Sequence, residues 1–170
     1  MSKHDFRVQL PLWNIAIFVI LMIFTYGAVY AADLLFSDLE GVFETVDGRE
    51  VINLHVPSIL AAFLGFFLVI VFFVAYFTKL ISHNREHPNR KQNAFSFLRP
   101  IEFLEDDEMF NQVTKNATKN VYTFYSNVMP LIMLFMLFPL DRYLFIMAIL
   151  LVLIVQNALY YREIRKYIVE

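Results

Sequence analysis

Four long apolar runs constrain this chain more than any other feature. They cover residues 15–32, 57–77, 121–140 and 143–161, and none contains Asp, Glu, Lys, Arg or His. A helix rises about 1.5 Å per residue, so about 20 residues cross a hydrocarbon layer of about 30 Å. Because backbone groups in lipid must pair within their own segment, each run predicts a helix. A soluble core is excluded, since 18% charged residues leave too little polar surface to cover four such helices.

We therefore expect an all-α membrane protein with four transmembrane helices arranged as two antiparallel hairpins. Residues 1–170 would form one domain, with an outer loop at 33–56 and a cytoplasmic loop at 78–120. The lipid bilayer is thus the first expected partner.

The distribution of Lys and Arg predicts the orientation. Only Arg49 and Arg142, of the 14 Lys and Arg residues, lie outside the N-terminal segment, loop 78–120 and the C-terminal tail. Cytoplasmic segments are enriched in these residues, which can also meet anionic lipid at that face. We expect a multi-pass protein of the cell membrane with both termini in the cytoplasm.

A cleavable signal peptide is an alternative for the first run. Lys3 and Arg7 precede it, and "AVYAAD" at residues 28–33 resembles a cleavage site. The run is longer than the usual stretch of about 7–15 residues. Trp13 and Asn14 also resemble an interfacial anchor. We expect the first span to be retained.

Small residues recur four apart where the first run ends and the second begins. Such spacing lets helix backbones approach closely in lipid, so we expect these two helices to touch at the outer level. The pairs are Gly27/Ala31, Ala28/Ala32, Ser58/Ala62 and Ala61/Gly65.

The outer loop carries a hairpin signal. Asp47-Gly48 lies between β-branched and apolar residues, which is typical of a tight turn between two strands. A short amphipathic helix over residues 35–46 is the alternative. The acids of this loop lack the spacing of a calcium loop, and we expect them to form solvated surface.

Polar amides interrupt the third and fourth runs. Asn127 lies in the third, Gln156 and Asn157 lie in the fourth, and the short link "PLDR" brings them to similar depths. We expect interhelical hydrogen bonds among these three amides, each worth about 0.6–2 kcal/mol. A polar pathway or ligand site is the alternative. Pro130 is expected to kink the third helix.

The polar segment before the third run reads as a cytoplasmic extension of the third helix. Apolar residues recur at steps of three and four from Phe110 to Val128, across the start of the run at Val121. Acids favour a helix N-terminus, with Asp106 or Asp107 as the N-cap. The acid cluster is also a candidate docking site for a basic partner; its members are Glu105, Asp106, Asp107 and Glu108.

The sequence "HNREH" at residues 83–87 matches the zinc motif H-x-x-E-H. Pro88 disfavours helical geometry at His87, and nothing in the sequence brings Glu163 close as a third ligand. The chain has no Cys, which excludes disulfides and thiolate metal sites. We find no catalytic constellation and expect no enzymatic activity, no metal and no cofactor. Nucleic-acid binding is not indicated either, because the membrane accounts for the basic stretch.

Residues 99–135, "RPIEFLEDDEMFNQVTKNATKNVYTFYSNVMPLIMLF", resemble a pattern in small uncharacterised membrane proteins of Gram-positive bacteria. In these an Asp-Glu-led helix with spaced Ala and aromatic residues feeds a two-span hairpin. Asp107-Glu108, Ala117 and residues 122–125 match, whereas Met109 stands where Arg often follows. The resemblance implies a bacterial plasma membrane and transfers no site residues.

A charged helix without catalytic residues favours a non-catalytic accessory or regulatory subunit of a membrane complex. Its expected partner is another protein or a second copy of the chain. The alternative is a small self-associating transporter or channel, with a path lined by Asn127, Gln156 and Asn157.

Overall fold

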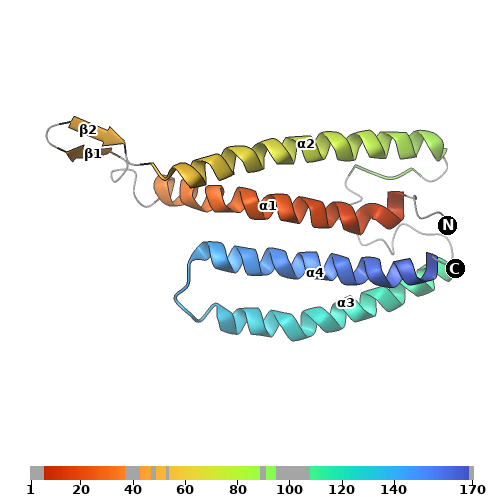
Figure 1. The fold of residues 1–170 in the computed structure, drawn as a ribbon. Coiled ribbons are helices and arrows are strands. Elements are labelled where there is room, and N and C mark those ends of the chain that lie inside the picture. The colour runs from red at the N-terminus through yellow and green to blue at the C-terminus, as the bar shows by residue number, and fades with distance from the viewer. Residues whose placement is uncertain are drawn as a thin grey trace.

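The computed structural model describes residues 6–36, 43–46, 49–52, 54–88, 91–94 and 108–168. Four long helices and one two-stranded hairpin make up the described chain (Figure 1). In chain order they are α1 (Phe6–Phe36), β1 (Phe43–Val46), β2 (Arg49–Ile52), α2 (Val56–Glu86), α3 (Glu108–Phe135) and α4 (Arg142–Ile168).

The helices run side by side along one axis (Figure 1). Phe6, Glu86, Glu108 and Ile168 lie at one end of the molecule, which we call the terminal end. The β-hairpin and the turn between α3 and α4 lie at the opposite end, which we call the hairpin end.

The four helices form an open row. α1 packs against α2 on one side and α4 on the other, and α4 packs against α3. The order across the row is therefore α2, α1, α4, α3, which leaves α2 and α3 at the two edges (Figure 1). The α2 edge is strongly apolar, with Phe63 71% and Phe67 61% exposed. Apolar exposure on this scale is typical of a surface that meets lipid or another protein.

Three helical segments, rather than four, are long and apolar enough to cross a membrane. Within the described residues these are Val8–Phe36, Val56–Glu86 and Arg142–Lys166. The prediction of a fourth span at 121–140 is corrected, because α3 ends at Phe135 and a turn follows. The apolar part of α3 is thus about 15 residues, or about 22 Å, short of a hydrocarbon layer of about 30 Å.

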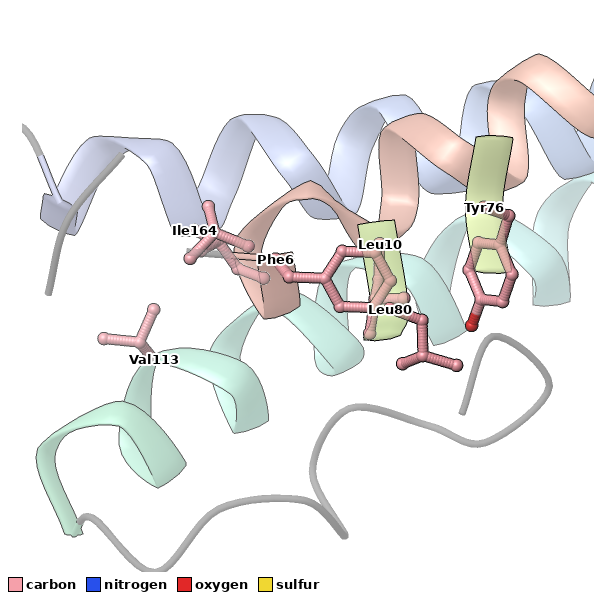
Figure 2. Close-up of a cluster of buried hydrophobic side chains, with 7 residues drawn as sticks. Phe6, Leu10, Tyr76, Leu80, Val113 and Ile164 are labelled. Carbon is pink, nitrogen blue, oxygen red and sulfur yellow. The ribbon is translucent and has the colours of Figure 1, made fainter. Parts of the chain in front are cut away.

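An apolar cluster at the terminal end joins all four helices. Phe6 contributes an aromatic ring that lies 5.7 Å from the ring of Tyr76 and 5.6 Å from that of His83. Figure 2 shows the side chain of Phe6 beside Leu10 and Leu80, with Tyr76, Val113 and Ile164 around them. The cluster consists of Phe6, Val8, Leu10, Tyr76, Leu80, Val113 and Ile164.

The polar segment before residue 121 does belong to the third helix. α3 begins at Glu108 and continues to Phe135, with Pro130 inside it. The extension does not project alone, however, because Val113, Thr114 and Ala117 are buried against the rest of the molecule. The expected N-cap residues 106 and 107 lie outside the described residues.

The hairpin predicted within loop 33–56 is confirmed. β1 and β2 pair antiparallel with Val46 opposite Arg49, which leaves the expected Asp47-Gly48 between them, although both residues lie outside the described part of the chain. The amphipathic-helix alternative is wrong for Phe43–Val46, since these residues form β1.

Two glycines bring α1 and α2 into close backbone contact, as the small-residue spacing predicted. A Cβ added at Gly27 would collide with the Ser58 carbonyl oxygen and with Ala62. A Cβ added at Gly65 would lie 2.5 Å from the Cα of Phe24. The two helices therefore touch through glycine surfaces that no larger residue fits.

Gly65→Leu is expected to destabilise the protein by about 1–3 kcal/mol, because the larger side chain forces α1 and α2 apart. Ala75→Leu is the matched control, since Ala75 is exposed on the same helix. Thermal unfolding in detergent measures both. Equal melting temperatures for the two variants would contradict the close approach.

Candidate functional site

A layer of polar side chains crosses three of the four helices at one level. Asn14 of α1 donates from Nδ2 to Oδ1 of Asn157 in α4, at 3.2 Å. The Tyr125 hydroxyl of α3 donates to Oε1 of Gln156 in α4, at 2.6 Å. Asn157 also donates from Nδ2 to the Leu153 carbonyl oxygen at 2.8 Å. We call Asn14, Tyr125, Gln156 and Asn157 the amide layer; it joins α1 to α4 and α4 to α3.

The amide layer lies closer to the terminal end than to the hairpin end. Counted along their helices, Arg7, Lys119 and Arg162 lie about five to seven residues from it, or about 8–11 Å. In the other direction Asp33 of α1 lies about 19 residues away, or about 28 Å, and forms an ion pair with Arg142 of α4. In a hydrocarbon layer of about 30 Å, these spacings place the amide layer in the third nearest the terminal end.

α2 reaches the same level through aromatic contacts. The Trp13 ring of α1 lies 5.6 Å from that of Phe72 and 5.8 Å from that of Tyr76. Lys79 follows within a turn or two of these residues. All four helices therefore place a basic residue at a similar distance beyond the amide layer, which agrees with a single membrane boundary there.

The structure places the three predicted amides in different surroundings. Gln156 and Asn157 both form interhelical hydrogen bonds, but with Tyr125 and Asn14 instead of with Asn127. Asn157 is buried, whereas Asn127 is exposed on α3. Sequence reasoning missed Asn14 and Tyr125 as partners. The signal for Asn14 was present, since it is an amide at the margin of an apolar run.

The exposed face of α3 carries a continuous polar stripe. Five of its residues follow one another at steps of three or four, and Ser126 lies beside the last of them. We call this set the outward stripe; it consists of Gln112, Asn116, Lys119, Thr123, Ser126 and Asn127, all exposed. The opposite face of α3 is buried at Val113, Ala117, Val121 and Ile132.

The outward stripe passes the level of the amide layer. From Gln112 to Asn127 it extends about 15 residues, or about 22 Å, and Asn127 lies beyond Tyr125 toward the hairpin end. This polarity, together with the helix end at Phe135, is the physical reason why α3 lacks a full apolar span.

The motif at residues 83–87 forms part of the terminal-end packing. His83 is buried, and its ring stacks on that of His87 at 4.8 Å. Glu163, the conceivable third ligand, forms an ion pair with Lys166 at 2.7 Å. Over the described part of the chain, no group of three or more His, Cys, Asp or Glu side chains is placed to hold a metal ion.

The segment after α2 is fastened back onto that helix. Asn84 donates from Nδ2 to the Gln92 carbonyl oxygen at 2.9 Å and accepts from the Gln92 amide at 2.7 Å. Gln92 is buried as a result. Of the predicted docking acids, Glu108 begins α3, and Glu105, Asp106 and Asp107 lie outside the described residues, so that docking role stays a prediction.

Comparison with protein families, with curated proteins and with solved structures found no match for this chain. The resemblance of residues 99–135 to small Gram-positive membrane proteins therefore stays a prediction.

The contact between Asn14 and Asn157 is expected to carry a coupling energy of about 0.6–2 kcal/mol, because both amides lie where water is scarce. A double-mutant cycle with Asn14→Leu and Asn157→Leu, followed by unfolding in detergent, measures it. The control cycle combines Asn14→Leu with Leu144→Ala, which lies about 13 residues, or about 20 Å, along α4 from Asn157 and should be additive within about 0.5 kcal/mol. Additive effects in the first cycle would contradict the contact.

Proposed function

We propose that this chain is a non-catalytic accessory or regulatory subunit of a membrane complex, with α3 as the helix that meets its partner. The three long apolar helices fit a membrane protein. The observation that carries the proposal is the outward stripe, a polar face on an edge helix that continues to the level of the amide layer.

The position of α3 supports a partner on that face. Only α4 covers α3 extensively among the described helices, so the outward stripe faces away from the row. Lipid tails offer no hydrogen bonds to Ser126 or Asn127, whereas another protein helix does. Nearer the terminal end, Gln112, Asn116 and Lys119 provide exposed polar groups for an aqueous part of the same contact.

We further propose that the terminal end lies in the cytoplasm and that the membrane is the cell membrane. Basic residues support this orientation, since Lys79, Lys119 and Arg162 all lie just beyond the amide layer toward the terminal end. Cytoplasmic flanks of spans are enriched in such residues.

Single cysteines test the orientation cleanly, because the chain contains none. With a membrane-impermeant maleimide on intact cells, Asp141→Cys at the hairpin end is expected to label and Lys91→Cys only after lysis. Both positions are exposed, so labelling reports their compartment. The reverse pattern would overturn the proposed orientation.

A self-associating transporter or channel is the second candidate, favoured by Asn127, an exposed amide at membrane depth. Gln156 and Asn157 bond toward different helices, α3 and α1. A path lined by all three amides would therefore require these hydrogen bonds to rearrange between several copies.

The accessory role is tested by purification of the tagged chain in mild detergent. A second protein is expected to co-purify, and Gln112→Ala/Asn116→Ala/Lys119→Ala is expected to reduce its yield about tenfold, equal to about 1.4 kcal/mol. The matched control is Lys79→Ala/Ser82→Ala/Arg85→Ala, an exposed set on the other edge helix, α2. A single-component preparation from the unaltered chain, or equal losses in both variants, would count against the proposal.

A further inference from the structure

Asn127 lies where neither lipid nor its own chain explains an exposed amide. It is about two residues, or about 3 Å, beyond Tyr125, whose hydroxyl fixes the level of the amide layer. Transfer of an amide to an apolar medium without a hydrogen bond costs about 2–7 kcal/mol. An exposed Asn at this depth therefore indicates a second hydrogen-bonding surface against α3.

The side chains around Asn127 let another helix approach closely. Thr123, one turn away, donates its hydroxyl to the Lys119 carbonyl oxygen at 2.9 Å, so it presents its methyl group outward at little polar cost. Ser126 is small and exposed beside it. Small and hydroxyl-bearing residues are enriched where helices associate in membranes.

An amide is complementary to another amide, because it carries both donors and an acceptor. A second copy inserted in the same orientation presents its own Asn127 at the same depth. A two-fold axis along the membrane normal then brings the two amides together without any adjustment of register, and two-fold contacts are the commonest in oligomers. Lys119 lies about 12 Å from Asn127 along the helix, where its long side chain can turn to lipid phosphates.

We propose that a second copy of this chain covers the membrane-level part of the outward stripe, with Asn127 hydrogen-bonded to Asn127 of that copy. The two rows then meet edge to edge through α3. This inference rests on the proposed role of α3 as the partner-facing helix and names the first partner as the chain itself.

Disulfide cross-linking in native membranes tests the contact, since the chain has no cysteine of its own. Ser126→Cys is expected to give a covalent dimer with an oxidant. Ala75→Cys is the control at matched depth, because Ala75 is exposed on α2 beside Phe72 and Tyr76, at the level of the amide layer. No dimer from Ser126→Cys, or an equal yield from Ala75→Cys, would overturn the inference.

The role of the amide is tested in the Ser126→Cys background. Asn127→Leu is expected to lower the dimer yield about three- to thirtyfold, the range for one interhelical polar contact. Val74→Ala, at an exposed apolar position of α2, is expected to leave the yield unchanged. Because Asn127 is exposed, neither substitution removes a contact within one chain, and each variant should keep the helical circular-dichroism signal of the unaltered chain. A yield insensitive to Asn127→Leu overturns the amide pair.

The mass of the cross-linked product separates this inference from the proposed function. A product of twice the chain mass supports the second copy, whether or not another protein co-purifies. A product of any other mass overturns the second copy, and the proposal that α3 meets a partner protein then stands on the co-purification alone.

Discussion

Polar groups inside a hydrocarbon layer must form their hydrogen bonds with protein groups. This constraint explains both the helical spans and the hydrogen bonds between the helices. It makes the spans helical, since a helix pairs its own backbone. It also explains the amide layer, where Asn157 of α4 meets Asn14 of α1 and Gln156 meets Tyr125 of α3. These hydrogen bonds join α4 to α1 and to α3. Apolar side chains alone would not determine which helices lie next to each other at this level. Outside this level, glycine contacts join α1 to α2, and the apolar cluster at the terminal end joins all four helices.

α3 differs from the other helices because its packed face and its exposed face have different chemical character. Its packed face is mostly apolar from Val113 to Ile132, with buried Thr114 and the Tyr125 hydroxyl as its polar groups. Its exposed face is polar as far as Asn127, and the helix ends about eight residues later at Phe135. An average over the run 121–140 hides this division, since the apolar residues near its end dominate the composition. The exposed face of α3 is thus suited to lipid only over a short segment, and within the described chain the helix packs mainly on α4.

The sequence predicted the features that depend on nearby residues in the chain. It did not predict the contacts that depend on the order of the helices in the row. Small residues at i, i+4 spacing located the contact at Gly27 and Gly65, and Asp47-Gly48 located the hairpin. The hydrogen-bond partners of Gln156 and Asn157 could not be predicted, because a single sequence does not show that α4 lies between α1 and α3. The expected bond to Asn127 assumed that polar residues at equal depth face one another. In the structure Asn127 faces the other way, and a hydroxyl, that of Tyr125, takes its place.

The two edges of the row are chemically unlike, and this asymmetry bears on function more than any single residue does. The α2 edge exposes large apolar side chains such as Phe63, Phe67 and Val74 along the membrane level. Lipid tails can cover such an apolar surface, so it does not require a particular protein partner. The α3 edge places Ser126 and Asn127 at a comparable depth, where lipid tails offer them no hydrogen bond. If α3 meets α3 of a second copy, both polar edges are covered, only apolar edges remain outside, and assembly stops at two.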